Sequence, residues 1–122
     1  MKFSEPDVRR LADLLSSAQN IVITTHRNPD ADAIGSSLGW MWYLQRKGHN
    51  VSVVLPTSYT DNLKWIPGTE HMMVYENEIG KKLCDARINA AHLVFCLDFN
   101  ALTRLEGLGE VIANASAEKV MI

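Results

Sequence analysis

The segment His26–Ser37 carries the side chains of this sequence that are best suited to chemistry. Within seven residues it offers the imidazole of His26 and the carboxylates of Asp30 and Asp32. It follows Ile21–Thr25, a β-branched run without polar alternation, which predicts a strand buried on both faces of a parallel sheet. In open α/β sheets, binding sites lie beyond the carboxyl ends of the strands. The sequence therefore places these three side chains where such sites occur.

A further carboxylate, Asp98, comes directly after the apolar run His92–Leu97, which predicts another buried strand. Because parallel strands end at the same edge of a sheet, we expect Asp98 to reach the crevice that holds Asp30 and Asp32. Carboxylates gathered in this way repel one another, and burying them unpaired is costly. Only Arg27 is near in sequence, so a divalent cation is the natural counter-charge.

The mixture of ligand types indicates which ion would bind. Histidine together with carboxylates suits Mn²⁺ or a similar ion better than Ca²⁺, which prefers oxygen ligands alone. Two such ions bridged by one carboxylate form the two-metal arrangement that hydrolyses phosphoesters. Single residues could instead have structural roles: Asp32 could cap a helix that starts at Ala33. Gly35 and Ser36 fit either close packing of that helix on the sheet or contact with a substrate phosphate.

The rest of the sequence predicts the elements that would position this segment. Alternating apolar and amphipathic stretches predict right-handed βαβ crossovers, and hence an α/β fold with a doubly wound, mainly parallel β-sheet and helices on both faces. Strands are expected at 21–25, 51–55, 72–75, 92–97 and 119–122. Helices are expected from Ser4, Pro6 and Asp7 onward, over 33–47 with Ile34, Leu38, Met41, Leu44 and Gln45 buried, over 78–87, and over 100–115 with a break at Gly107 or Gly109.

Length and composition limit the classes of function. A chain of 122 residues predicts one domain, and 12 basic against 14 acidic residues leave no basic field for stable binding of duplex nucleic acid. The N-terminus lacks a signal-peptide core, and no run approaches a membrane span. Cys84 and Cys96 are expected to be reduced packing residues of a cytoplasmic protein. The three tryptophans are expected to pack, although Trp65 lies in a long connection that could edge a site.

The sequence resembles the DHH family of phosphoesterases. The family's first motif, a His followed by Pro-Asp-x-Asp and Gly-Ser after the first strand, matches His26, Pro29–Asp32 and Gly35–Ser36 position by position. The second motif, an Asp after an apolar strand, matches Asp98. The stretch Leu63–Gly68 is similar to the branch of bacterial nanoRNases that also dephosphorylate pAp.

The resemblance implies a manganese-dependent hydrolase with two ions, for which Mg²⁺ or Co²⁺ are substitutes. His26 and Asp30 would bind the first ion, Asp32 the second, and Asp98 would bridge them, so that Asp32 and Asp98 are the catalytic carboxylates. Gly35 and Ser36 would contact the substrate, which would be a short oligoribonucleotide, pAp or a related nucleotide. The sequence leaves the oligomeric state open.

The sequence departs from the family in three respects. The Asp-His-His motif that gives the family its name is absent, the family's next metal-binding Asp is also absent, and nothing resembles the glycine-rich C-terminal substrate-binding domain. The final run Lys119–Ile122 looks like the strand that ends directly before that motif. Residues 1–122 are therefore expected to be the N-terminal part of a DHH phosphoesterase domain, and to be inactive alone.

Three further hypotheses remain open at this point. One is a receiver domain, a signalling module with a phosphoacceptor Asp, although its acids should be adjacent whereas Ala31 separates Asp30 from Asp32. Another is a haloacid-dehalogenase-type phosphatase, although its nucleophilic Asp should stand directly at the strand end. A third is a non-catalytic fragment that binds only metal or a partner.

Overall fold

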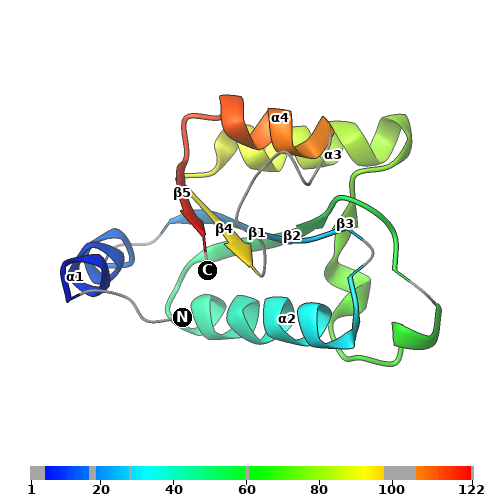
Figure 1. The fold of residues 1–122 in the computed structure, drawn as a ribbon, viewed down its shortest axis with the longest axis horizontal. Helices are drawn as coiled ribbons and strands as arrows, with labels where there is room; N and C mark the ends of the chain where they lie inside the picture. The colour runs from blue at the N-terminus through cyan, green and yellow to red at the C-terminus, as the bar shows by residue number, and fades with distance from the viewer. Residues whose placement is uncertain (1–4, 17–18, 28, 60, 98–106, 122) are drawn as a thin grey trace.

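The computed structural model describes residues 5–16, 19–27, 29–59, 61–97 and 107–121, which form one five-stranded sheet with helices on both of its faces (Figure 1). All pairs of neighbouring strands are parallel. The strands are β1 (Asn20–Thr25), β2 (Asn50–Leu55), β3 (Met73–Val74), β4 (Leu93–Leu97) and β5 (Glu118–Met121). The helices are α1 (Glu5–Leu14), α2 (Ala31–Arg46), α3 (Asn77–Ala90) and α4 (Gly107–Asn114), with two short 3-10 helices, η1 (Asp61–Leu63) and η2 (Thr69–His71). The predicted fold class, an α/β doubly wound parallel sheet, is confirmed.

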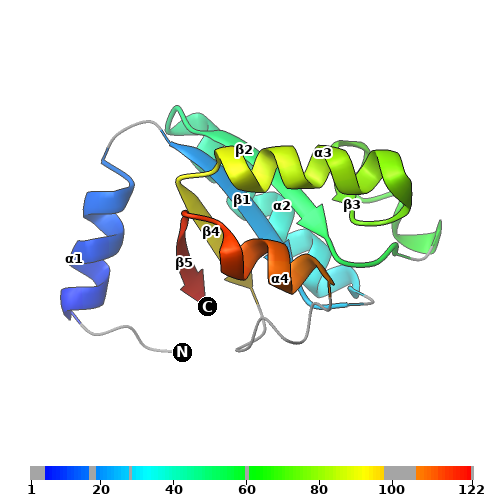
Figure 2. The ribbon, with the colours of Figure 1, turned by 90° about the horizontal axis from the view of Figure 1, so that it is seen from above.

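The side chains of the sheet alternate between two apolar layers. Ile21, Ile23 and Phe95 belong to the cluster that packs on α2, whereas Val22 and Cys96 belong to the cluster under α3 and α4. Figures 1 and 2 show these helices on opposite sides of the sheet. Burial on both faces explains why the strands read as continuous apolar runs in the sequence.

Several predicted boundaries need correction. Helix α2 begins at Ala31 rather than Ala33, and of its predicted buried stripe only Gln45 is exposed. Helix α3 extends to Ala90, three residues beyond the prediction. Helix α4, described over Gly107–Asn114, continues through Gly109 without a break. The predicted helical residues 100–106 and Ser4 lie outside the described part of the chain.

The order of the strands identifies the functional edge of the sheet. The order is β3-β2-β1-β4-β5, so the chain builds outward from β1 on one side and then returns to add β4 on the other. In such sheets, ligands bind at the carboxyl ends of the two strands where the direction of winding changes, here β1 and β4. Receiver domains have the order 2-1-3-4-5 instead. The receiver interpretation is therefore wrong.

Helix α1 lies at the β5 edge of the sheet rather than on one of its faces (Figure 1). Its Arg10 forms an ion pair with Glu118 at the start of β5, and this pairing raises the pKa of the guanidinium further above its ordinary value. Leu11 and Leu14 pack against the apolar cluster on the α2 side of the sheet. None of the helices in the described ranges is long and apolar enough to span a membrane.

Both cysteines are free thiols in the layer between the sheet and helices α3 and α4, as predicted. Burial raises the pKa of each thiol to about 11, with a smaller contribution from Asp85 at Cys84, while Lys119 acts in the opposite direction at Cys96. Since a thiolate, not a thiol, is the nucleophile and metal ligand, neither sulfur is available for that chemistry near neutral pH.

Candidate active site

The carboxyl ends of β1 and β4 lie side by side and are linked by a hydrogen bond. In the ladder between these strands, Thr25 pairs with Leu97, and the Thr25 hydroxyl donates a hydrogen bond to the Leu97 carbonyl oxygen at 3.0 Å. His26 follows the first of these residues in the sequence, and Asp98 follows the second. Asp98 itself, a predicted metal ligand and catalytic residue, lies outside the described residues. The hydrogen bond fixes the end of the strand from which Asp98 continues.

The imidazole of His26 is half-buried at the carboxyl end of β1. Its Nδ1 lies 2.8 Å from the backbone carbonyl oxygen of Arg27. A carbonyl oxygen can only accept, so Nδ1 is the donor in this contact. Histidines that bind metals characteristically donate their other ring nitrogen to such an acceptor, which fixes the tautomer. The local geometry of His26 therefore suits a metal ligand.

Asp30 is the N-cap of α2. Its Oδ1 accepts a hydrogen bond from the backbone N–H of Ala33 at 2.8 Å, and its backbone is extended, as a capping residue requires. The cap uses only one of the two carboxylate oxygens. Because Pro29, the preceding residue, is buried, the turn that aims Asp30 is anchored in the molecule.

Asp32 lies in the first turn of α2 and is exposed. The capping role considered for Asp32 belongs instead to Asp30, which is why the helix begins two residues earlier than predicted. A carboxylate in the first turn is stabilised by the partial positive charge of a helix N-terminus. Asp32 is therefore not needed as a cap, and its side chain is available for binding.

The donor types fit a Mn²⁺-like ion, since one imidazole and two carboxylates follow the end of β1 in the sequence. Among the residues that the structure describes, however, no three His, Cys, Asp or Glu side chains form a group that could hold a metal. His26, Asp30 and Asp32 are thus not a closed cluster by themselves. The predicted metal site depends on Asp98.

The helical turn that follows Asp32 has an open side. Gly35 and Ser36 are exposed, and a Cβ atom at Gly35 would meet no described atom within 4 Å. Close packing of helix on sheet therefore does not explain Gly35. The buried neighbour in this turn is Ser37, whose hydroxyl donates to the Ala33 carbonyl oxygen at 2.8 Å. Contact of Gly35 and Ser36 with a substrate phosphate stays a prediction.

The sequence reasoning overlooked Thr25. The signal was the Thr24-Thr25 pair that ends an otherwise aliphatic strand, since a hydroxyl at such a buried position needs a partner. Both residues are fully buried. Thr25 has its bond to Leu97, whereas the Thr24 Oγ1 has no hydrogen-bond partner among the described residues.

Comparison with known proteins agrees with this geometry. The profile of the DHH family, N-terminal domain, matches residues 20–122. The crystal structure of an exopolyphosphatase-related protein from Bacteroides fragilis superposes with a TM-score of 0.91 at 34% sequence identity. The superposition covers 98% of this chain and 34% of that protein. This chain thus spans about a third of the length of its solved relative.

Proposed function

Because this chain belongs to the DHH family, we propose that it contributes the metal-binding half of a manganese-dependent phosphoesterase that hydrolyses short oligoribonucleotides or pAp-like nucleotides. The family and the exopolyphosphatase-related neighbour support a phosphoesterase-type hydrolase activity. The observation that carries the proposal is the position of the first motif: His26, Asp30 and Asp32 follow β1 where it adjoins β4, at the winding switch of the sheet.

Each of the four residues has a proposed role. His26 and Asp30 would hold one ion, Asp32 would hold a second, and Asp98 would be a ligand of both. Bound ions of this kind acidify water and neutralise the negative charge that develops around phosphorus. The protein's own contribution is alignment: the carbonyl of Arg27 fixes the His26 tautomer, and the cap bond to Ala33 holds one oxygen of Asp30.

The open side of α2 is the proposed place for the substrate phosphate. Backbone N–H groups and the positive end of the helix dipole favour an anion at a helix N-terminus. The absence of a side chain at Gly35 leaves room for a phosphate to approach the backbone, and the Ser36 hydroxyl can donate to it. A mononucleotide such as pAp and the terminal phosphodiester of an oligonucleotide both offer this group.

Binding is the decisive measurement for residues 1–122. On the proposed roles, the first ion has three protein ligands, His26, Asp30 and Asp98, whereas the second ion has only Asp32 and Asp98. Two-metal hydrolysis needs both ions in place, so turnover by this chain alone should be very slow. Isothermal titration with Mn²⁺ should detect binding that Asp98→Asn weakens strongly. Thermal melts should then show stabilisation by pAp only when Mn²⁺ is present.

Three results would contradict this proposal in different ways. Stabilisation by polyphosphate but not by pAp would favour a polyphosphate substrate, as the name of the solved relative suggests for that protein. Binding of Mn²⁺ without any effect of pAp, oligonucleotide or polyphosphate would favour a metal-binding part without a substrate site. Unchanged Mn²⁺ affinity in Asp98→Asn would overturn the ligand assignment.

A further inference from the structure

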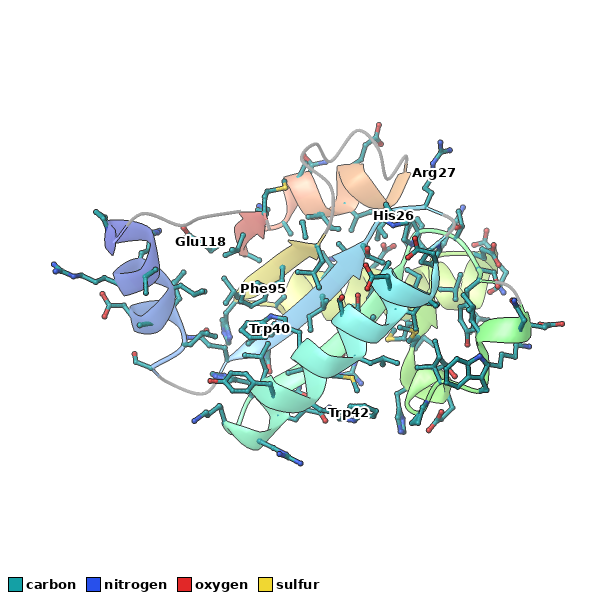
Figure 3. All side chains as sticks on the ribbon, turned by 60° about the horizontal axis from the view of Figure 1, so that its bottom comes forward. His26, Arg27, Trp40, Trp42, Phe95 and Glu118 are labelled. Carbon is teal, nitrogen blue, oxygen red and sulfur yellow. The ribbon has the colours of Figure 1, made fainter. Side chains whose placement is uncertain are left out.

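Several aromatic and imidazole side chains lie outside the proposed site. Trp40 packs as predicted, with its ring meeting the edge of Phe95 between α2 and the sheet (Figure 3). Trp65 is 75% exposed, so the prediction that it packs is wrong. Two histidines, His49 and His92, have defined partners: each contacts the backbone at the amino end of the central strand β1.

The two histidines occupy equivalent positions in the fold. His49 directly precedes β2 and His92 directly precedes β4, so they stand on either side of β1 at its amino end. The backbone N–H of Gln19 donates a hydrogen bond to Nδ1 of His49 at 3.1 Å. The N–H of Asn20, the next residue, donates to Nδ1 of His92 at 3.0 Å. Two consecutive backbone donors at the start of the central strand thus have imidazole acceptors.

Backbone hydrogen bonds join the same segments. The N–H of Asn50 donates to the Gln19 carbonyl oxygen at 3.0 Å, and the N–H of His92 donates to the Asn20 carbonyl oxygen at 2.8 Å. Each imidazole bond is therefore a second link between β1 and the start of a neighbouring strand. Both links lie at the end of the sheet opposite to His26, so breaking them removes no ligand of the proposed metal site.

The direction of these hydrogen bonds defines the charge of both rings. A backbone N–H can only donate, so Nδ1 carries a lone pair and the proton of the neutral ring is on Nε2. A protonated imidazole has an N–H on both nitrogens and would turn a donor toward another donor. Each of the two bonds therefore exists only while its imidazole is neutral.

Burial makes this requirement stricter at His49. Only 6% of its surface is exposed, and its Nε2 is buried without a hydrogen-bond partner among the described residues. A charge there would have neither water nor an acceptor for the Nε2 proton, and burying a charge in this way is costly. His92 is exposed, so water can solvate its charge, and protonation costs only the bond to Asn20.

The charged groups of the surrounding elements do not favour a further positive charge. Strand β5 contributes Glu118, whose carboxylate already pairs with Arg10 of α1 (Figure 3). The other charged side chains are those that line a pocket with Gln19 and those at the ends of the helices that precede the two histidines: Arg9 and Asp13 of α1, Lys47 after α2, and Arg87 in the last turn of α3. Cations outnumber carboxylates in this set.

We propose that His49 and His92 make the amino end of β1 an acid-sensitive part of the fold. A proton from a hydronium ion or a buffer acid adds to the Nδ1 lone pair, which breaks the bond to Gln19 or Asn20 and releases that end of the strand. The carboxyl end stays closed by the bond between Thr25 and Leu97. The inference does not depend on the proposed function.

The sign of the pH dependence follows from the two states. The released ring can take up a proton that the bound ring cannot, so acid favours the released state. An ordinary histidine has a pKa of about 6.5, so a released ring is charged about ten times as often as it is neutral at about pH 5.5. The bonds are therefore fully present well above pH 6.5 and are lost progressively below it.

The test measures hydrogen exchange of the Gln19 amide by NMR at about pH 7.5 and about pH 5.5, corrected for the intrinsic exchange rate at each pH. We expect its protection to fall about tenfold at the lower pH, the ratio of charged to neutral released rings, while the Ile23 amide inside β1 changes less. In His49→Asn, a side-chain carbonyl oxygen can replace Nδ1 as the acceptor and does not titrate, so this loss should disappear. His71→Asn is the matched control, since His71 is exposed and its Nε2 lies 3.5 Å from a carboxylate oxygen of Glu70.

Two results of this experiment would overturn the inference. One is a Gln19 amide that is equally protected at both pH values, and the other is an equal loss of protection in His49→Asn. A second measurement on wild type needs no variant: at neutral pH, the chemical shifts of the ring nitrogens should show Nδ1 unprotonated and Nε2 protonated in both His49 and His92. A proton on Nδ1 of His49 would contradict the hydrogen bond on which the inference rests.

Discussion

The Thr25 hydroxyl is hydrogen-bonded to the Leu97 carbonyl oxygen at 3.0 Å, across the ends of the two central strands. Both residues precede predicted metal ligands, His26 and Asp98. The bond therefore ties together the starting points of two chain segments whose side chains, on the proposed ligand assignment, would bind the same ion. Its strength bears on the stability of the fold and also on the precision of the proposed site.

Thr25→Val should lower the free energy of unfolding by about 0.5–1.5 kcal/mol, because it removes the part-buried hydrogen bond from the Thr25 hydroxyl to the Leu97 carbonyl oxygen. Urea unfolding measures the loss. Thr24→Val is the matched control: the buried Thr24 hydroxyl has no partner in the part of the chain that the structure describes, so this change should be neutral or stabilising. Equal losses in the two variants would show that the bond to Leu97 is not the cause.

Asp30→Asn should separate the capping role from the metal-binding role. Asparagine caps helices as well as aspartate does, so stability without metal should be unchanged. At a hundredfold excess of Mn²⁺ over Kd, wild type should gain about 2.7 kcal/mol, and the variant should lose most of this gain. Asp30→Ala should also lose about 1 kcal/mol from the cap.

Thermal melts with and without Mn²⁺ measure both effects. Asp61→Asn provides the control carboxylate, since Asp61 pairs with Lys64 at 2.9 Å. It should keep the full response to Mn²⁺. A full response in Asp30→Asn would remove Asp30 from the ligand set.

Gly35→Ala should stabilise the fold and weaken substrate binding. Alanine favours a helix interior over glycine by about 0.5–1 kcal/mol, and the added Cβ has space. The same Cβ would fill the approach of the phosphate, so pAp affinity with Mn²⁺ should fall several-fold. Gly39→Ala, at an equally open position of α2, should give the stability gain alone. Unchanged pAp affinity in Gly35→Ala would refute the phosphate contact.

Alkaline pH should destabilise the protein through Cys84, whose burial raises its thiol pKa from 9.0 to about 11. Between these two values the unfolded chain loses the proton and the folded chain keeps it, so the free energy of unfolding falls as pH rises. The stabilisation is fully present below pH 9. In Cys84→Ala, the free energy of unfolding measured with urea should fall less steeply with pH in this window. The part of the pH dependence that remains is due to Cys96, whose thiol pKa is also raised.

The strands and the doubly wound, parallel arrangement of the sheet could be predicted from the sequence. A strand that is buried on both faces is a continuous apolar run, such as Ile21–Thr25. It was less reliable at helix ends. Asp30 and Asp32 are both good caps by residue type, and only backbone geometry decides that Asp30 takes the bond from Ala33. Gln45 was assigned to the core by periodicity, but in the last turn of α2 only Leu44 is buried and Gln45 is exposed.

The residue types of the site could be predicted from the sequence, but the orientation and exposure of the individual side chains could not. The positions of His26, Asp30 and Asp32 follow from their place after β1. The tautomer of His26 depends on the direction of the Arg27 carbonyl. The exposure of Trp65 depends on the packing of its neighbours Leu63 and Ile66 against the core. The local sequence indicates neither feature. Tertiary contacts decide both.

The pairing of β1 with β4 also has a kinetic consequence. Thr25 and Leu97 are 72 positions apart, so the central ladder closes a long loop, and contacts of such separation slow folding. During synthesis, β1 can pair with β2 while α2 docks, but its other edge stays open until residue 97 has left the ribosome. The two motifs that define the proposed catalytic edge therefore cannot come together before β4 has been synthesised.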